Sequence, residues 1–482
     1  MNDILQLKPE RVWYYFNEIC KIPRPSKKEE KITAWLVEFG KAQGLETLTD
    51  EVGNVLIRKP ASPDKEKSKI VVLQSHTDMV CEKNASTNHD FDKDPIQPVI
   101  DGEWIKAKGT TLGADDGIGI AAQLAVLEAK DILHGPVECL FTVDEETGLT
   151  GAFALKPDFV KGRVLLNLDS EDEGQLFIGC AGGKDTTVSF NFKKEKTPDL
   201  HIAFKISVTG LKGGHSGDDI NKGLGNAVKI INRFLWNAIE KYSIRISKID
   251  GGNLRNAIAR EAFAYFVIPE SSKKDVLNYV VEYNNAVKDE LKVTEPDLKF
   301  TIESAEKSEF VIDSDTQMRL LNSLYACPHG VIAMTADMPG LVETSTNLAS
   351  VKTLDNKILV QTSQRSSVES SKDDIASMVE SVFRLAGADV SHGEGYPGWK
   401  PNLNSELVKV MRKTYQKLFN REPLVLAIHA GLECGVIGEK YQGMDMISFG
   451  PTLRGVHSPD ERINIESVEM FWKLLIEVLK EL

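Results

Sequence analysis

The sequence predicts an α/β protein with a largely parallel sheet, interrupted by an inserted α+β domain. Short apolar runs alternate with helix-like stretches early in the chain, period-two alternation replaces them in the middle, and helical spacing returns near the end. Continuous apolar runs suit strands buried on both faces, whereas period-two alternation suits a sheet with one face in water. We therefore expect one domain in two parts, residues 1–183 and 395–482, around an inserted domain over 184–394.

The first domain begins with two predicted amphipathic helices. Apolar residues at helical spacing define them, namely Val12, Tyr15, Phe16 and Ile19, then Ile32, Trp35, Leu36 and Phe39, with Gly44 as a stop. Buried strands are expected over residues 70–73, 137–143, 164–168 and 446–449, with a helix over 117–129 between the first two. Alternation of strand, helix and strand predicts the parallel sheet.

The inserted domain is expected to combine alternating strands with a helix. Ile202, Phe204, Ile206 and Val208 alternate with more polar residues, and a helical face follows from Ala227 to Ala238. Further strands are expected over 244–249 and 358–362, before helices return over 407–418 and 468–482. No internal repeat is visible in the sequence.

Composition excludes several classes of protein. The chain has 71 acidic and 58 basic residues, a net charge of −13, which disfavours a nucleic-acid or anionic-membrane partner. No apolar run approaches the roughly 18 residues of a membrane span, and the start lacks the pattern of a secretory signal. The six cysteines are far apart in the sequence and form no CxxC pair. We expect reduced thiols and a cytoplasmic protein.

Carboxylates and an imidazole follow the predicted buried strands. His76 and Asp78 follow the first strand, Asp144, Glu145 and Glu146 follow the second, and Asp169 follows the third. Because side chains alternate along a strand, His76 and Asp78 should point to one side, where the carboxylate can orient a metal-binding imidazole. Each piece also has an ordinary interpretation, as an incidental pair or a solvated acidic loop.

Two further pieces complete the candidate site. Asp115 and Asp116 open the predicted helix in a glycine-rich stretch, which indicates either helix capping or a close approach of the backbone to another group. His457 lies in the loop after the fourth strand. Open α/β sheets bind ligands at the carboxyl edge of their strands, so we expect these groups to converge.

The donor set predicts a pair of metal ions. Carboxylates with imidazoles match Zn²⁺, Mn²⁺ or Co²⁺ rather than Ca²⁺ or a thiolate site, and we expect Zn²⁺ first among them. The five candidate ligands exceed what one open catalytic zinc normally takes; they are His76, Asp115, Glu146, Asp169 and His457. Two divalent ions sharing one carboxylate are therefore predicted.

The motifs HTDMV, GADDG, DEETG, LDSE and GVHS, in this order, resemble those of the M20 clan of co-catalytic metallopeptidases. GGHSGDDI, GGNLRNAIAR, YPGW and HAGLECG are similar to the aminoacyl-histidine dipeptidase branch of that clan, so the resemblance extends over essentially the whole chain. It implies a di-metal hydrolase domain of α/β type with an inserted α+β lid and dimerisation domain.

The resemblance also implies a role for each candidate ligand. His76 and Asp169 would bind one ion, Glu146 and His457 the other, and Asp115 would bridge them. A cis peptide is expected at Asp115–Asp116. This chain has DDG followed by isoleucine where many clan members carry a lysine, a difference that leaves the metal roles untouched.

Two carboxylates would act beside the ions. Asp78 would orient His76, and Glu145 would be the general base. Neighbours at the end of a strand point different ways, so Glu146 can bind metal while Glu145 faces the substrate.

Further residues are candidates for contacts with the substrate. The resemblance implies that His215 reaches the active site of a partner subunit, and hence a homodimer. Arg365, expected just after a strand of the inserted domain, and Asn256 are candidates for the substrate carboxylate; each has the alternative of a surface salt bridge or a turn. His429 and Glu433 are expected to line one pocket, with Glu433 facing an ammonium group.

The expected function is hydrolysis of unblocked L-dipeptides, including Xaa-His substrates such as β-alanyl-histidine. The alternatives are an aminoacylase, deacetylase or tripeptidase of the same clan, or an inactive binding module that reuses the fold. The presence of all five proposed ligands together with Asp78 and Glu145 argues against the inactive module.

Overall fold

The computed structural model describes residues 4–482, and the chain forms two units. The first segment of unit 1 ends at Cys180, and the unit continues through Trp399–Ala427 and Leu432–Leu482. Unit 2 contains Ala181–Gly398 and Ile428–Gly431. The expected division lay after residues 183 and 394, and it placed Ile428–Gly431 in the first domain, whereas the structure groups this segment with unit 2.

Unit 1 contains the elements on both sides of the insertion. Its helices are α1 (Glu10–Ile19), α2 (Glu30–Ala42), α3 (Ala114–Glu128), α4 (Glu145–Gly148), α5 (Thr150–Ala154), α10 (Glu406–Phe419), α11 (Glu433–Lys440) and α12 (Ile465–Glu481). Its strands are β1 (Glu46–Thr49), β2 (Val55–Lys59), β3 (Val71–His76), β4 (Pro98–Asp101), β5 (Trp104–Ala107), β6 (Val137–Thr142), β7 (Val164–Asn167), β8 (Gln175–Cys180), β20 (Leu424–Ile428), β21 (Asp445–Ser448), β22 (Leu453–Arg454) and β23 (Arg462–Asn464).

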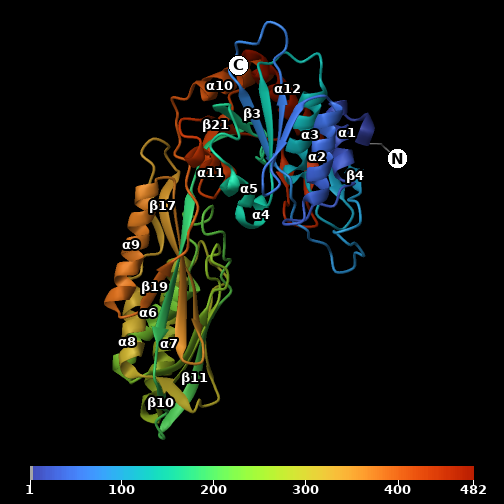
Figure 1. Ribbon diagram of the computed structural model, residues 1–482. Helices are drawn as coiled ribbons and strands as arrows, with labels where there is room; N and C mark the ends of the chain where they lie inside the picture. The colour runs from blue at the N-terminus through green and yellow to red at the C-terminus, as the bar shows by residue number, and fades with distance from the viewer. Residues whose placement is uncertain (1–3) are drawn as a thin grey trace. The chain divides into compact units, whose positions relative to one another are not determined.

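The main sheet of unit 1 has eight strands in the order β1-β2-β6-β3-β7-β21-β8-β20. The centre of this sheet, from β6 to β21, is parallel, which confirms the predicted α/β layer. Helices cover both faces (Figure 1): Val71 and Leu73 of β3 pack into the core formed with α1, α3 and α12, while Val72 packs into the core formed with α5 and α11. This burial on both faces explains why the strands are continuous apolar runs.

Unit 2 contains the remaining elements. Its strands are β9 (Gly182–Asn191), β10 (Lys194–Lys196), β11 (His201–Thr209), β12 (Arg245–Gly251), β13 (Ala262–Pro269), β14 (Lys299–Ser304), β15 (Phe310–Ile312), β16 (Gly330–Met334), β17 (Val342–Thr353), β18 (Lys357–Ser366) and β19 (Asp389–His392). Its α-helices are α6 (Ala227–Tyr242), α7 (Lys273–Leu291), α8 (Ser314–Ala326) and α9 (Glu369–Leu385).

The large sheet of unit 2 runs in the order β14-β11-β13-β12-β17-β18-β9-β19, with β16 paired to β17. The four helices α6 to α9 lie on one face of this sheet (Figure 1) and share one core with its strands. Alternate residues of β11, such as Phe204, Ile206 and Val208, are buried in that core. The period-two pattern therefore has the predicted cause, because only one sheet face is covered by helices.

This sheet contains a repeat that the sequence does not reveal. The elements β11-α6-β12-β13-α7-β14 and β9-α8-β17-β18-α9-β19 have the same order along the chain, and their strands lie in the equivalent orders β14-β11-β13-β12 and β19-β9-β18-β17. The two halves join edge to edge through antiparallel β12 and β17. No repeat was visible in the sequence, because this repeat lies in the connectivity of the elements rather than in their residues.

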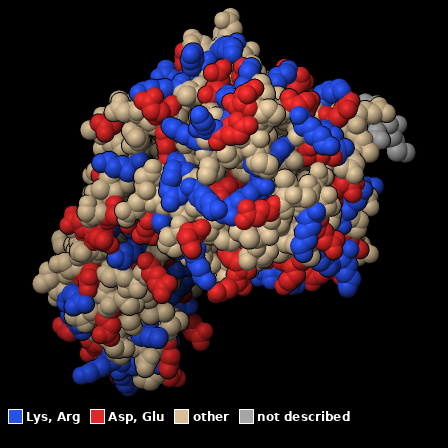
Figure 2. Space-filling view, turned by 45° about the horizontal axis from the view of Figure 1, so that its top comes forward, with Lys and Arg blue, Asp and Glu red and all other residues tan. Residues whose placement is uncertain are grey.

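The structure shows how the charged side chains are distributed and whether the cysteines are paired. On the face shown in Figure 2, acidic and basic side chains are interspersed. Among the described residues, the six cysteines form no disulfide bond. Within residues 4–482, none of the helices combines the length and apolarity needed to span a bilayer.

Candidate active site

The end of β3 places His76 in the interior of unit 1, where the side chain is 1% exposed. Its Nδ1 lies 3.3 Å from Asp78 Oδ1, as the alternation of side chains predicts. Its Nε2 faces two further carboxylates, 3.0 Å from Asp115 Oδ1 and 3.4 Å from Asp169 Oδ1. His76 therefore has one ring nitrogen on an orienting carboxylate and the other free to bind a cation between Asp115 and Asp169.

Asp115 lies between two groups of potential ligands. Its Oδ2 is 3.1 Å from His457 Nε2, and the same nitrogen is 3.1 Å from Glu146 Oε2. The predicted ligands thus form two clusters, one of His76, Asp115 and Asp169 and one of Asp115, Glu146 and His457; within each, the ligand atoms lie within 4.8 Å of one another. One carboxylate is common to both clusters.

The backbone at the start of α3 departs from helical geometry at Asp115 and Asp116. Gly113 adopts a left-handed conformation with φ 68°, and the Asp115–Asp116 peptide is cis, as expected. A Cβ at Gly113 or Gly117 would lie 2.7 Å from Arg24 Nη2. Gly113 and Gly117 therefore leave space for the buried side chain of Arg24, a residue that the sequence did not indicate as part of the site.

Glu145 and Glu146 do not lie at the end of a strand. They begin the one-turn helix α4 after Asp144, which has a left-handed φ of 51°. The expectation that strand alternation directs them apart was wrong, because the chain turns directly after β6. Glu145, Glu146 and His76 form a further group of ligand atoms within 4.8 Å, so both carboxylates face the same region.

Asp78 contacts both His76 and the start of α4. Its Oδ1 accepts the backbone N–H of Glu145 at 3.0 Å, and its Oδ2 accepts the N–H of Glu146 at 3.2 Å and the Ser26 hydroxyl at 2.7 Å. Burial opposes ionisation of Asp78, but hydrogen bonding to His76 and the other donors holds its pKa at about 2. Asp78 is therefore an anion that orients both His76 and α4.

The electrostatics of the clusters fit bound cations. Burial raises the pKa of Asp169 to about 8, and burial also raises the pKa of Glu145 well above its ordinary value. Hydrogen bonds to Asp115 and Glu146 raise the pKa of His457 to about 11. Glu146 Oε1 is buried without a hydrogen-bond partner among the described residues. Such crowded carboxylates require positive charge, and oxygens with imidazole nitrogens suit Zn²⁺, Mn²⁺ or Co²⁺.

A second group of candidates lies together in unit 2. Arg365 is 6% exposed, and its Nη2 lies 3.5 Å from His215 Nε2 while its Nη1 donates to the Tyr396 hydroxyl at 2.9 Å. Arg365 lies within β18 rather than after the strand as expected, because β18 extends to Ser366. Tyr396 belongs to the YPGW turn, which carried the resemblance but no assigned role.

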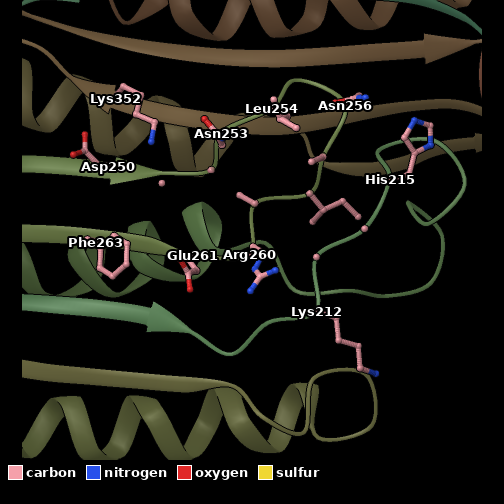
Figure 3. A pocket seen from close by; sticks show the side chains of 17 residues that line it. Lys212, His215, Asp250, Asn253, Leu254, Asn256, Arg260, Glu261, Phe263 and Lys352 are labelled. Atoms are coloured by element: carbon pink, nitrogen blue, oxygen red, sulfur yellow. The ribbon is translucent and has the colours of Figure 1, made fainter. Parts of the chain in front are cut away.

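The remaining two unit 2 candidates lie beside these residues. His429 accepts or donates a hydrogen bond of 2.7 Å with the Ser345 hydroxyl, and its carbonyl packs on Gly217, two residues from His215. The Asn256 carbonyl accepts the N–H of Ser216 at 2.8 Å. Asn256 and His215 lie at one end of a cavity of about 700 Å³, with Asp250, Lys352 and Phe263 at the other (Figure 3).

Glu433 belongs to unit 1, so the structure divides the HAGLECG motif between the units. It begins α11 and is fully buried, and its Oε2 accepts hydrogen bonds from Gln74 at 2.5 Å and Thr142 at 2.8 Å. Its Oε1 has no hydrogen-bond partner among the described residues. Burial raises the pKa of Glu433 to about 7. This free oxygen gives Glu433 the capacity to accept from a cation.

Comparisons with known proteins agree with this geometry. The sequence model of Peptidase family M20/M25/M40 matches residues 72–481. The chain is 47% identical over 486 residues to the cytosol non-specific dipeptidase of Escherichia coli K12, covering 100% of this chain and 99% of that protein.

Solved structures show the same similarity. The aminoacylhistidine dipeptidase of Vibrio alginolyticus is 44% identical with a TM-score of 0.94, covering 100% of this chain and 98% of that one. An aminopeptidase PepT of Bacillus cereus shares the fold at 18% identity and a TM-score of 0.58, covering 98% and 99% of the two chains.

Proposed function

This chain belongs to peptidase family M20/M25/M40, and from that membership we propose that it is a metal-dependent dipeptidase that hydrolyses unblocked L-dipeptides, including Xaa-His substrates. The observation that carries the proposal is Asp115, which faces His76 with one oxygen and His457 with the other, beside Glu145. The similarity to two dipeptidases over their full lengths supports the substrate class.

The two clusters suggest how a pair of ions is held. We assign His76 and Asp169 to one divalent ion and Glu146 and His457 to the other, with Asp115 between them. When bound, such a pair of ions acidifies water towards neutral pH and polarises the scissile carbonyl. Zn²⁺ is our first assignment, with Mn²⁺ and Co²⁺ as alternatives, since the donors suit all three.

Glu145 is the proposed general base. It lies with His76 and Glu146 in one group, and the Asp78 carboxylate fixes its backbone N–H. Its carboxylate would take a proton from the attacking water and pass it to the amine that leaves. Burial raises the pKa of Glu145, which makes its carboxylate a stronger base than an exposed glutamate.

Further candidates are proposed to recognise the substrate, each on the basis of the chemistry of its own side chain. The Arg365 guanidinium suits the free carboxylate, with Asn256 as a second donor on that side, and the partnerless oxygen of Glu433 suits the ammonium group. His215 is proposed to donate to the oxyanion that develops on the scissile carbonyl, and His429 to line the pocket.

Arg365→Lys is expected to raise the KM for a dipeptide by about 10- to 100-fold, because a lysine cannot bind a carboxylate in bidentate geometry. The measurement is steady-state kinetics on a dipeptide and on the same dipeptide with an amidated C-terminus. The wild type should prefer the free acid, and the variant should lose most of that preference.

Arg233→Lys is the matched control, because Arg233 pairs with Glu290 on an exposed surface of unit 2. It should leave the KM unchanged. An Arg365→Lys enzyme that keeps the wild-type preference for the free acid would remove Arg365 from the substrate site.

Chelation is expected to abolish hydrolysis of dipeptides, and refilling with divalent metal should restore it. Chelated protein is refilled with Zn²⁺, Mn²⁺ or Co²⁺ in turn and assayed on an Xaa-His dipeptide, a tripeptide and an N-acetyl amino acid. The dipeptide should be the fastest substrate. Faster cleavage of the acetylated amino acid or the tripeptide would favour another activity of the family, and no hydrolysis with any ion would indicate an inactive binding module.

We further propose a cytoplasmic homodimer that associates through unit 2. The similar protein of Escherichia coli K12 is named as a cytosol dipeptidase, which supports the proposed cytoplasmic location. Sedimentation equilibrium is expected to give twice the chain mass. A monomer that retains full activity would exclude a required partner subunit, and His215 would then act beside Arg365 of its own chain, 3.5 Å away.

A further inference from the structure

Residues 112–115 form the loop through which the chain enters α3, and Asp115 at its end has non-helical backbone angles. A buried carboxylate from a distant part of the chain holds this loop. Glu461 is 2% exposed. Its Oε2 accepts the N–H groups of Leu112 at 2.7 Å and Gly113 at 3.0 Å, and its Oε1 accepts those of Ala114 at 2.8 Å and Asp115 at 3.3 Å. Both oxygens act only as acceptors here, so one side chain determines the orientation of four consecutive peptide groups.

The same carboxylate belongs to the turn that carries His457. Strands β22 and β23 pair as a hairpin, and the turn between them contains both His457 and Glu461. The N–H of Glu461 donates to the Ser458 carbonyl at 3.0 Å, which closes this turn. His457 Nε2 reaches Asp115 Oδ2 at 3.1 Å from this same turn. Glu461 therefore joins the segment with a ligand of the second cluster to the segment with the shared ligand.

Arg24 holds the opposite side of the loop. It is 2% exposed, and its Nη2 donates to the Gly113 carbonyl. Its Nη1 donates to the carbonyls of Thr77 at 3.0 Å and Asp78 at 2.7 Å. Arg24 thus connects the loop before Asp115 to the segment after His76. The missing Cβ of Gly113 leaves the space for its guanidinium.

These contacts join the segment that carries Asp115 to two ligand segments, those of His76 and His457. Glu461 accepts the peptide N–H groups of the loop, Arg24 donates to one of its carbonyls, and each side chain also belongs to or contacts a ligand segment. A metal pair needs a bridging carboxylate whose distances to both ions are within a few tenths of an ångström of the ideal values. Neither side chain belongs to the ligand clusters, so both can act only through Asp115 and its neighbours.

We propose that Glu461 and Arg24 are positioning residues that hold the Asp115 carboxylate between the two metal sites. The inference rests on the proposed two-ion function. A merely structural cap of α3 would contribute stability without affecting the affinity for metal, whereas a positioning residue sets the affinity of the sites that share Asp115.

The test is a titration of chelated full-length protein with Co²⁺, followed by visible absorption and heat. Wild type should bind two ions. Glu461→Gln should bind at least one of them about 10- to 100-fold more weakly, because the amide NH₂ faces backbone donors and releases part of the loop. At saturating Co²⁺ its kcat should fall while its KM for a dipeptide stays near the wild-type value.

Glu138→Gln is the matched control for loss of a buried carboxylate. Glu138 lies on β6 away from the site and is 2% exposed, and its Oε2 accepts the N–H groups of Lys161 and Gly162, each at 2.8 Å. This variant should lose thermal stability but bind both ions like wild type. Wild-type Co²⁺ affinities in Glu461→Gln would overturn the proposal.

Arg24→Lys tests the contacts on the other side of the loop. It also provides the test of the proposal if the Glu461→Gln protein does not fold. A single ammonium nitrogen cannot occupy the positions of both Nη1 and Nη2, from which the three carbonyl contacts are made, so weaker Co²⁺ binding is expected; unchanged affinity would overturn the proposal. Failure of the proposed function has a different outcome, since the wild-type protein itself would then not bind two ions.

Discussion

Glu145→Gln is expected to lower kcat for dipeptide hydrolysis by about 10²- to 10⁴-fold while both metal ions stay bound. Glutamine keeps the size of the side chain but cannot accept a proton from water. The ligand clusters around Asp115 do not contain Glu145, and Asp78 still holds the backbone of α4. The measurements are single-turnover kinetics and metal content on the same preparation.

Two further variants separate chemistry from metal binding. Glu146→Gln should lose one ion, because Glu146 Oε2 lies 3.1 Å from His457 Nε2 in the second cluster. Glu282→Gln changes an exposed glutamate of α7 and should behave as wild type. Wild-type turnover in Glu145→Gln would end the assignment of Glu145 as the base, and loss of metal from it would move Glu145 into the ligand set.

Asp115→Ala is expected to reduce hydrolysis by about 10³-fold or more and to leave fewer than two ions per chain. Asp115 is the only side chain common to the two main clusters among the described residues, so its loss removes a ligand from both. Losing a bound cation removes several kcal/mol of transition-state stabilisation, and each 1.4 kcal/mol is a factor of ten in rate. Metal analysis and activity after refilling measure both effects.

Thermal unfolding gives an independent measure of the same change. A ligand that binds only the folded state raises its stability, so adding Zn²⁺ should raise the Tm of wild type more than that of Asp115→Ala. Asp92→Asn is the control, since Asp92 forms an exposed pair with Lys28. An Asp115→Ala protein that binds two ions with wild-type affinity would contradict the bridging role.

The location of the candidate site could be predicted from the sequence, because several of its polar residues lie at or just after the ends of predicted strands. His76 ends β3, Asp169 lies two residues after β7, and Glu146 lies four residues after β6 in α4; parallel strands bring these carboxyl ends to one edge. The converging clusters confirm that expectation of a common location. The direction of Glu145 was not predictable from strand alternation, because a left-handed residue at Asp144 starts a helical turn where an extended chain was assumed.

The contacts between segments that are far apart in the chain could also not be predicted from the sequence. Arg24 reaches Gly113, and Glu461 reaches residues 112–115 from the other end of the chain. A buried arginine on backbone carbonyls needs no particular neighbour in the sequence, so no local pattern precedes it. The glycines before and within α3 were a visible sign that something approaches the backbone closely, but only the structure identifies Arg24 as the group that does so.

Local periodicity predicted the buried strands of the parallel layer, the one-sided strands of the inserted domain and several helices, and the polar residues after the buried strands marked the candidate site. These features are readable because burial on one face or two imposes a pattern on consecutive residues. Tertiary structure alone decided that Arg24 and Glu461 hold the segment before Asp115, that HAGLECG divides between the units, and that the sheet of unit 2 contains a repeat. These properties depend on which distant segments come into contact in the folded chain. Such contacts impose no periodic pattern on consecutive residues, so the local sequence does not predict them.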